Sequence, residues 1–196
     1  MRNNISWDEY FMGVALLSSQ RSKDPHTKVG ACIVNEDKRI VGIGYNGMPY
    51  GCDDKVYPWD NDKKADSLDT KYPYVVHAEP NAILNSTSNL KGSTLYVTLF
   101  PCNECMKAII QSGITEIIYL DNHNFTKDTY VGSRYMVNVH NRNERLPKIT
   151  LREYSITDRA KMIIVKSILE NRTIIPQEEV KEHDKSLKLE TKSTNM

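Results

Sequence analysis

The spacing of apolar residues predicts a helix followed by a β-hairpin in the first fifty residues. Between residues 6 and 20 apolar side chains recur at the spacing of one helical face: Trp7, Tyr10, Phe11, Val14 and Leu17. Ser6 and Glu9 form the pattern of a capping box at the start of this helix. Two strand-like runs, 29–34 and 40–44, flank the polar segment Asn35-Glu36-Asp37-Lys38, which indicates a hairpin.

Helical and strand patterns then alternate along the chain. A long loop over 46–73 precedes a helix that opens near residue 77, a strand at 94–98, a helix that opens near residue 102 and a strand at 116–120. This order predicts a mixed sheet between layers of helices. We also expect a helix at 157–170 and an edge strand at 173–175. One domain would then cover residues 5–176, followed by a charged, disordered tail at 177–196.

Composition narrows the choice of function. The 196 residues are 39% hydrophobic and carry a formal net charge of only +1, with both signs interspersed. Binding to polynucleotides usually needs a basic excess, so we expect a small substrate and no nucleic-acid partner. Neither a targeting segment nor a membrane span is visible in the sequence. The four cysteines indicate a reducing compartment, so we expect a cytoplasmic protein.

The chemistry is concentrated in two short motifs. His77-Ala78-Glu79 is followed about two dozen residues later by Pro101-Cys102-Asn103-Glu104-Cys105. One imidazole and two thiolates can hold Zn²⁺ while its fourth position stays open to water, which the metal activates as a nucleophile. Glu79 is placed to move protons without being a ligand. The paired motifs match the signature of zinc deaminases of bases.

Two alternatives accompany this interpretation. A lone Cys-x-x-Cys is also typical of a redox pair, and a structural zinc ribbon would use the same residue types. The ribbon needs a fourth protein ligand, and none is evident nearby. Cys52 could join a histidine in a second metal site, or it could be an ordinary packed thiol.

Beyond the metal motifs, several segments of residues 6–120 resemble the deoxycytidylate deaminases of the cytidine deaminase superfamily. These segments are Ser22 to Ala31, Gly44 to Pro49, Lys71 to Tyr74 and Leu99 to Cys105. The resemblance implies a three-layer α-β-α fold, of the α/β class, in which a mixed five-stranded sheet carries helices on both faces. It also implies zinc-dependent hydrolysis of dCMP to dUMP and ammonia, a reaction that feeds dTMP synthesis.

The resemblance assigns roles to individual residues. His77, Cys102 and Cys105 correspond to the zinc ligands and Glu79 to the proton shuttle. Asn46 corresponds to the residue that contacts the substrate sugar, and Val29 to one that lines the base pocket. For the 5′-phosphate the nearest polar and cationic residues of the matching region are Lys23, Thr27 and Lys28.

Regulation and assembly are further implications of the resemblance. Family members are typically hexamers that dCTP activates and dTTP inhibits, with Mg²⁺ accompanying the triphosphate. The corresponding effector segment contains Gly44, Tyr45, Asn46, Gly47, Pro49 and Asp53. Residues 121–155 are polar and look like an insertion before the final helix. We weigh two other functions against dCMP deamination: deamination of cytidine or dCTP, and nucleotide sensing by a zinc-bearing protein that has lost catalysis.

Overall fold

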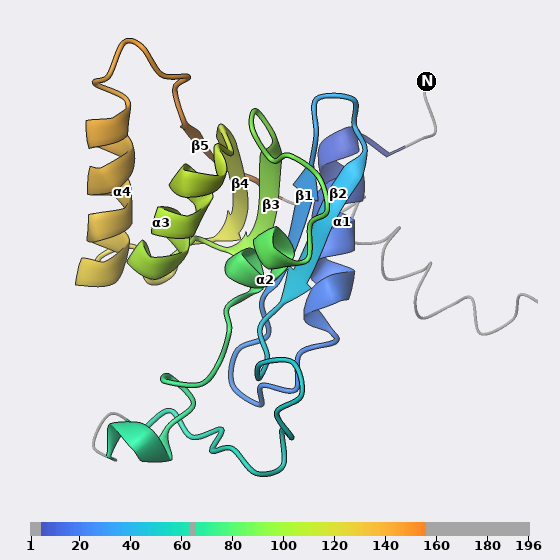
Figure 1. Ribbon diagram of the computed structural model, residues 1–196, viewed down its shortest axis with the longest axis vertical. Coiled ribbons are helices and arrows are strands. Elements are labelled where there is room, and N and C mark those ends of the chain that lie inside the picture. Colours follow the sequence, from blue (N-terminus) through green and yellow to red (C-terminus); the bar gives the residue numbers. More distant parts are fainter. Residues whose placement is uncertain (1–4, 63–65, 156–196) are drawn as a thin grey trace, which may run out of the picture. The chain divides into compact units, whose positions relative to one another are not determined.

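The computed structural model of the chain describes residues 5–62 and 66–155 and contains a mixed five-stranded sheet between helices (Figure 1). The strands lie in the order β2-β1-β3-β4-β5, where β1 is antiparallel to both of its neighbours and β3, β4 and β5 are parallel. The elements are α1 (Trp7–Ser19), β1 (Gly30–Val34), β2 (Ile40–Tyr45), the 3₁₀ helix η1 (Ser67–Asp69), α2 (Ala78–Leu84), β3 (Thr94–Leu99), α3 (Asn103–Ser112), β4 (Glu116–Asp121), α4 (Asp128–His140) and β5 (Thr150–Glu153).

The two faces of the sheet are covered by different helices, which confirms the predicted three layers. Alternate strand residues point to opposite faces. Cys32, Val34 and Tyr96 pack with Phe11 and Ala15 of α1. On the other face, α2 and α3 pack against the intervening strand residues in a larger cluster that includes Ala31, Ile33, Ala82, Leu95, Val97, Met106, Ile109 and Ile117. Figure 1 shows α2, α3 and α4 on the face opposite α1.

The first predicted elements are present. Ser6 caps α1, and its hydroxyl accepts the Glu9 backbone N–H at 3.2 Å while the Glu9 carboxylate accepts the Ser6 N–H at 2.6 Å, so the capping box is confirmed. β1 and β2 pair as the predicted hairpin, with Gly30 opposite Tyr45. The long loop after β2 projects from the end of the sheet at which α2 and α3 begin (Figure 1).

The structure places residues 121–155 within the domain. They form α4, which packs beside α3, and β5, which is the fifth strand of the sheet. Val137 and Ile149 belong to the same buried cluster as the central strands. The segment therefore completes the sheet and core. The expected helix at 157–170, the strand at 173–175 and the tail at 177–196 lie outside the described residues.

None of the helices within 5–62 and 66–155 has the length and apolar character that crossing a membrane requires.

Candidate active site

The two metal motifs meet because each stands at the start of a helix. His77 is the N-cap of α2 and Cys102 the N-cap of α3, both with extended backbone angles. Each therefore directly precedes its helix, and the two helices begin where the sequence predicts, near residues 77 and 102. Glu79 and Cys105 follow within the first turns. Since the helices lie side by side on one face of the sheet, their N-terminal ends bring these four side chains together.

The three predicted ligands are spaced for a metal ion. The ligand atoms of His77, Cys102 and Cys105 all lie within 4.8 Å of one another. His77 Nδ1 is 3.2 Å from Cys105 Sγ and 3.5 Å from Cys102 Sγ, and the two sulfurs are 3.6 Å apart. Tetrahedral Zn²⁺ with bonds of about 2.0–2.3 Å to nitrogen and sulfur would set its ligand atoms roughly 3.5–3.8 Å apart. The donor set and its spacing thus fit zinc.

The pKa values of the two cysteine thiols are shifted in opposite directions. A hydrogen bond from Cys105 lowers the pKa of Cys102 to about 4, and the His77 ring adds to this effect. The same hydrogen bond, together with burial, raises the pKa of Cys105 well above its usual value. One thiolate is therefore present at neutral pH even in the protein alone. Binding of a metal then requires the loss of the second proton.

Glu79 lies beside the ligands but is not one of them. Only 4% of the residue is exposed, and burial raises the pKa of its carboxyl above the ordinary value. A buried carboxyl group that accepts a proton readily and lines a cavity is suited to carry protons between water and a bound base. The structure places Glu79 beside the group of His77, Cys102 and Cys105 and outside it, and its role as proton shuttle stays a prediction.

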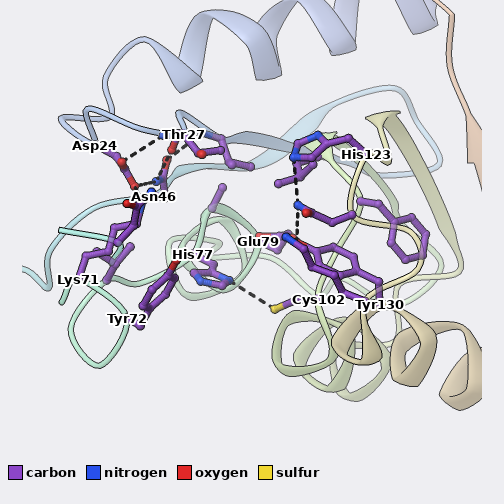
Figure 2. A pocket seen from close by; sticks show the side chains of 18 residues that line it. Asp24, Thr27, Asn46, Lys71, Tyr72, His77, Glu79, Cys102, His123 and Tyr130 are labelled. Atoms are coloured by element: carbon purple, nitrogen blue, oxygen red, sulfur yellow. Dashed lines mark hydrogen bonds and ion pairs between the residues drawn. The ribbon is translucent and has the colours of Figure 1, made fainter. Parts of the chain in front are cut away.

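A cavity of about 320 Å³ opens above this group of residues. Figure 2 shows His77, Glu79 and Cys102 between two polar walls, one with Asp24, Asn46 and Lys71, the other with His123 and Tyr130. The full lining consists of Asp24, Thr27, Val29, Asn46, Asn61, Lys71, Tyr72, Val75, His77, Ala78, Glu79, Leu99, Phe100, Cys102, His123, Asn124, Lys127 and Tyr130. A cavity of this volume can hold a small molecule the size of a nucleotide.

The predicted substrate residues divide into two groups. Thr27, Val29 and Asn46 line the cavity. Lys23 and Lys28 do not: the ammonium of Lys23 pairs with Asp54, and Lys28 is exposed outside the lining. The structure thus brings together the polar candidates but not the two predicted cations.

Asn46 is held rigidly in its wall. Its Oδ1 accepts the Val29 N–H at 2.8 Å, and its Nδ2 donates to Thr27 O at 2.9 Å and to Asp24 Oδ2 at 3.1 Å. Both amide hydrogens are therefore engaged inside the protein. Any bond from Asn46 to a ligand would use the second lone pair of Oδ1.

Several lining residues could not be found from the sequence. Lys71 belongs to a motif of the family resemblance, but a lysine in a polar loop is usually solvated, and nothing in the sequence indicates its burial. His123, Asn124, Lys127 and Tyr130 come from the segment 121–155, whose polar composition carries no signal of a cavity wall. The five residues share no spacing that would have brought them together before the fold was known.

The predicted effector residues Gly44, Tyr45, Gly47, Pro49 and Asp53 lie along β2 and the loop after it. Of these, Gly44 has a clear structural role. A Cβ at this position would lie 2.2 Å from the carbonyl oxygen of Ala78 and 2.4 Å from the backbone nitrogen of Ala82, so the glycine permits α2 to pack closely on β2. Effector binding by this segment stays a prediction.

The two remaining cysteines lie away from the metal group. Cys32 is fully buried in β1, and burial raises its pKa to about 12. Cys52 is half-buried, and its sulfur accepts a hydrogen bond from the Tyr57 hydroxyl at 3.5 Å. Among the residues that the structure describes, His77, Cys102 and Cys105 form the single group of three or more ligand side chains that could hold a metal, and Cys52 is not part of it.

Fold and site together define a class of protein. A three-layer α/β domain with a His/Cys/Cys metal group and a buried glutamate at two adjacent helix starts is the architecture of the zinc-dependent base deaminases. The family described as "cytidine and deoxycytidylate deaminase zinc-binding region" matches residues 5–121. The chain belongs to this family.

Individual relatives support the assignment. The deoxycytidylate deaminase of Homo sapiens is 56% identical over 136 residues, which cover 69% of this chain and 76% of the human protein. The deoxycytidylate deaminase of Mus musculus is 58% identical over 127 residues, or 64% of this chain and 71% of the mouse protein. The structure of a dCMP deaminase from cyanophage S-TIM5, in complex with dCMP and dUMP, is 28% identical with a TM-score of 0.57 and covers 79% of this chain and 99% of that one.

Proposed function

We propose that this protein is a zinc-dependent deoxycytidylate deaminase, which converts dCMP and water to dUMP and ammonia and so supplies the precursor of dTMP. The observation that carries the proposal is the meeting of His77, Cys102 and Cys105 with a buried Glu79 at the floor of a cavity. The mammalian relatives named above support the choice of substrate, since each is a deoxycytidylate deaminase and each is more than half identical over its matched residues.

The metal ligands and Glu79 divide the chemistry between them. His77, Cys102 and Cys105 would hold Zn²⁺, which when bound supplies the Lewis acidity that activates a water molecule near neutral pH. The Glu79 carboxylate would take a proton from the attacking water and pass it to N3 of the cytosine as the water oxygen adds to C4. It then carries the second water proton to the amino group, which leaves as ammonia when the C4–N bond breaks. The ring becomes uracil.

The cavity walls would position the nucleotide. Val29, Leu99 and Phe100 offer apolar surface around the floor where the base must lie. Asn46, fixed by its bonds to Val29, Thr27 and Asp24, presents a rigid oxygen to the sugar. Such prearranged contacts hold the reacting carbon against the activated water.

Purified protein gives the direct test. We expect about one zinc per chain and release of ammonia from dCMP, measured against cytidine, deoxycytidine and dCTP. Glu79→Gln keeps the size and hydrogen-bonding capacity of the side chain but cannot shuttle protons, so turnover should fall by roughly 10²–10⁴-fold while zinc is retained. A Glu79→Gln enzyme that turns over normally would contradict the proton-shuttle role. A zinc-loaded wild type without ammonia release would favour a nucleotide sensor.

On the basis of the family resemblance we also propose that dCTP and dTTP regulate the enzyme. The same resemblance suggests that Mg²⁺ accompanies the effector and that the protein assembles into a hexamer. They are tested by assays of dCMP turnover with each triphosphate, with and without Mg²⁺, and by light scattering. We also propose a cytoplasmic location, because free thiols require a reducing environment.

A further inference from the structure

Lys71 is a buried cation in the wall of the cavity. Its side chain is 9% exposed, and its ammonium donates to Asp24 Oδ2 at 2.5 Å. Within residues 5–62 and 66–155 this carboxylate oxygen is the one hydrogen-bond partner of the ammonium. Because an ammonium carries three N–H donors, two remain that the protein does not use, and they are available to a ligand in the cavity that Lys71 lines.

Asp24 fixes the ammonium without leaving negative charge free to face the cavity. Its Oδ1 accepts the backbone N–H groups of His26 at 2.8 Å and Thr27 at 3.1 Å, and its Oδ2 accepts Asn46 Nδ2 at 3.1 Å in addition to Lys71. The side chain is 1% exposed. Four donors therefore surround the carboxylate, and the unfilled donors of this wall belong to the cation.

Other groups on this wall suit an anion as well. Thr27 lines the cavity, and its backbone is tied to the carboxylate that holds Lys71. Tyr72, the next residue in the chain, also lines the cavity on the side of Lys71 (Figure 2). The opposite wall has one lysine, Lys127, but it is exposed, as most surface lysines are, and solvent can satisfy its donors.

We infer that Lys71, held in place by Asp24, is the residue that binds the 5′-phosphate of the substrate and makes the enzyme specific for a nucleotide over a nucleoside. The inference rests on the proposed function, because dCMP offers one anionic group and the base must lie over Glu79. A phosphate oxygen fills the unfilled donors of the ammonium, and the Thr27 hydroxyl can donate to the same group. Asp24 acts through Lys71 and Asn46 as a positioning residue.

The test compares two substrates that differ only in the phosphate. The ratio of kcat/KM for dCMP to kcat/KM for deoxycytidine is measured for the wild type, for Lys71→Met and for the double variant Asp24→Asn with Lys71→Met. Loss of a charge-assisted bond to phosphate should lower this ratio by about tenfold or more, mainly through KM for dCMP. The double variant contains no unpaired buried charge, so it separates phosphate binding from any folding defect of Lys71→Met.

A matched control removes a different ion pair. Arg152 pairs with Asp8 at 2.9 Å away from the cavity lining, and the variant Asp8→Asn with Arg152→Gln should leave the substrate ratio as in the wild type. An unchanged ratio in the folded, zinc-loaded double variant would overturn the inference. So would a fall in the ratio that appears with Lys127→Met and not with the Lys71 variants. A wild type that releases no ammonia from dCMP contradicts the proposed function itself, which distinguishes the two failures.

Discussion

Replacement of Gly44 by alanine tests whether this residue of the Gly-Tyr-Asn-Gly-Met-Pro motif is a packing requirement. The added Cβ would lie 2.2 Å from Ala78 O and 2.4 Å from Ala82 N, about 1 Å inside an ordinary contact of 3.4 Å. Both atoms are helix backbone, so no side chain can rotate away. The variant can form only if α2 moves off β2 by about the length of the overlap.

The expected magnitude follows from this displacement. Overpacking of a filled interior destabilises proteins by about 1–3 kcal/mol and occasionally by more. A rigid backbone on the receiving side puts Gly44→Ala at the upper end of that range. The same movement carries His77 and Glu79 with the helix, and misplacement of reacting groups by about 1 Å lowers turnover by about 10²-fold. Zinc affinity should fall as well, because the other ligands belong to α3.

Gly47→Ala in the same motif is the control. Its Cβ would meet only the Tyr45 ring, at 3.7 Å, which is an ordinary contact. We expect its free energy of unfolding to stay within about 1 kcal/mol of the wild type. Urea unfolding of zinc-loaded protein, zinc content and dCMP turnover are measured for both variants. Equal stability and equal zinc content in the two variants would refute the packing role of Gly44 and leave effector binding as its explanation.

Three further outcomes are expected. Burial raises the pKa of Asp24, but the hydrogen bonds from Lys71 and from backbone N–H groups outweigh burial and hold this pKa below its ordinary value of 3.8. The ionised carboxylate therefore stabilises the fold above about pH 4, and this stability is lost as the pH falls through the lower pKa of the folded state. Asp24→Asn should accordingly flatten the acid limb of a plot of stability against pH. Iodoacetamide at pH 8 should label half-buried Cys52 before Cys32, whose pKa burial raises to about 12, and mass spectrometry of peptides checks the order. Ser133, fully buried on α4, donates to Pro101 O at 2.9 Å beside the metal loop, so Ser133→Ala should lose about 1 kcal/mol in urea unfolding.

The metal group could be predicted from the sequence because its chemistry is local. Two helix starts carry all four residues, and their types and order already specify the donor set. The hairpin and α1 were equally accessible, since period and capping residues define them without tertiary information. Strand alternation assigns each residue of the hairpin to one face of the sheet, and the partners on that face follow only from the tertiary fold.

The fifth strand and the fourth helix were not predictable in the same way. β5 has the sequence Thr-Leu-Arg-Glu, and as an edge strand it packs Leu151 against the core while its other side chains are exposed. α4 buries little beyond Ser133 and Val137, so its apolar period is weak. Pairing with β4 and packing on α3 stabilise these elements, and neither interaction leaves a pattern within the segment itself.

The sequence alone could not show which lysine lines the cavity. Lys23 belongs to the segment Ser22 to Ala31 and is one of the candidates that the sequence offers for phosphate, yet it pairs with Asp54 outside the cavity lining. Lys71 is nearly fifty positions away, and its ion pair with Asp24 joins the loop before α2 to the loop before β1. Charge recognition in this cavity therefore depends on a contact between loops. A substitution that loosens this contact should impair nucleotide binding even if every metal ligand keeps its place.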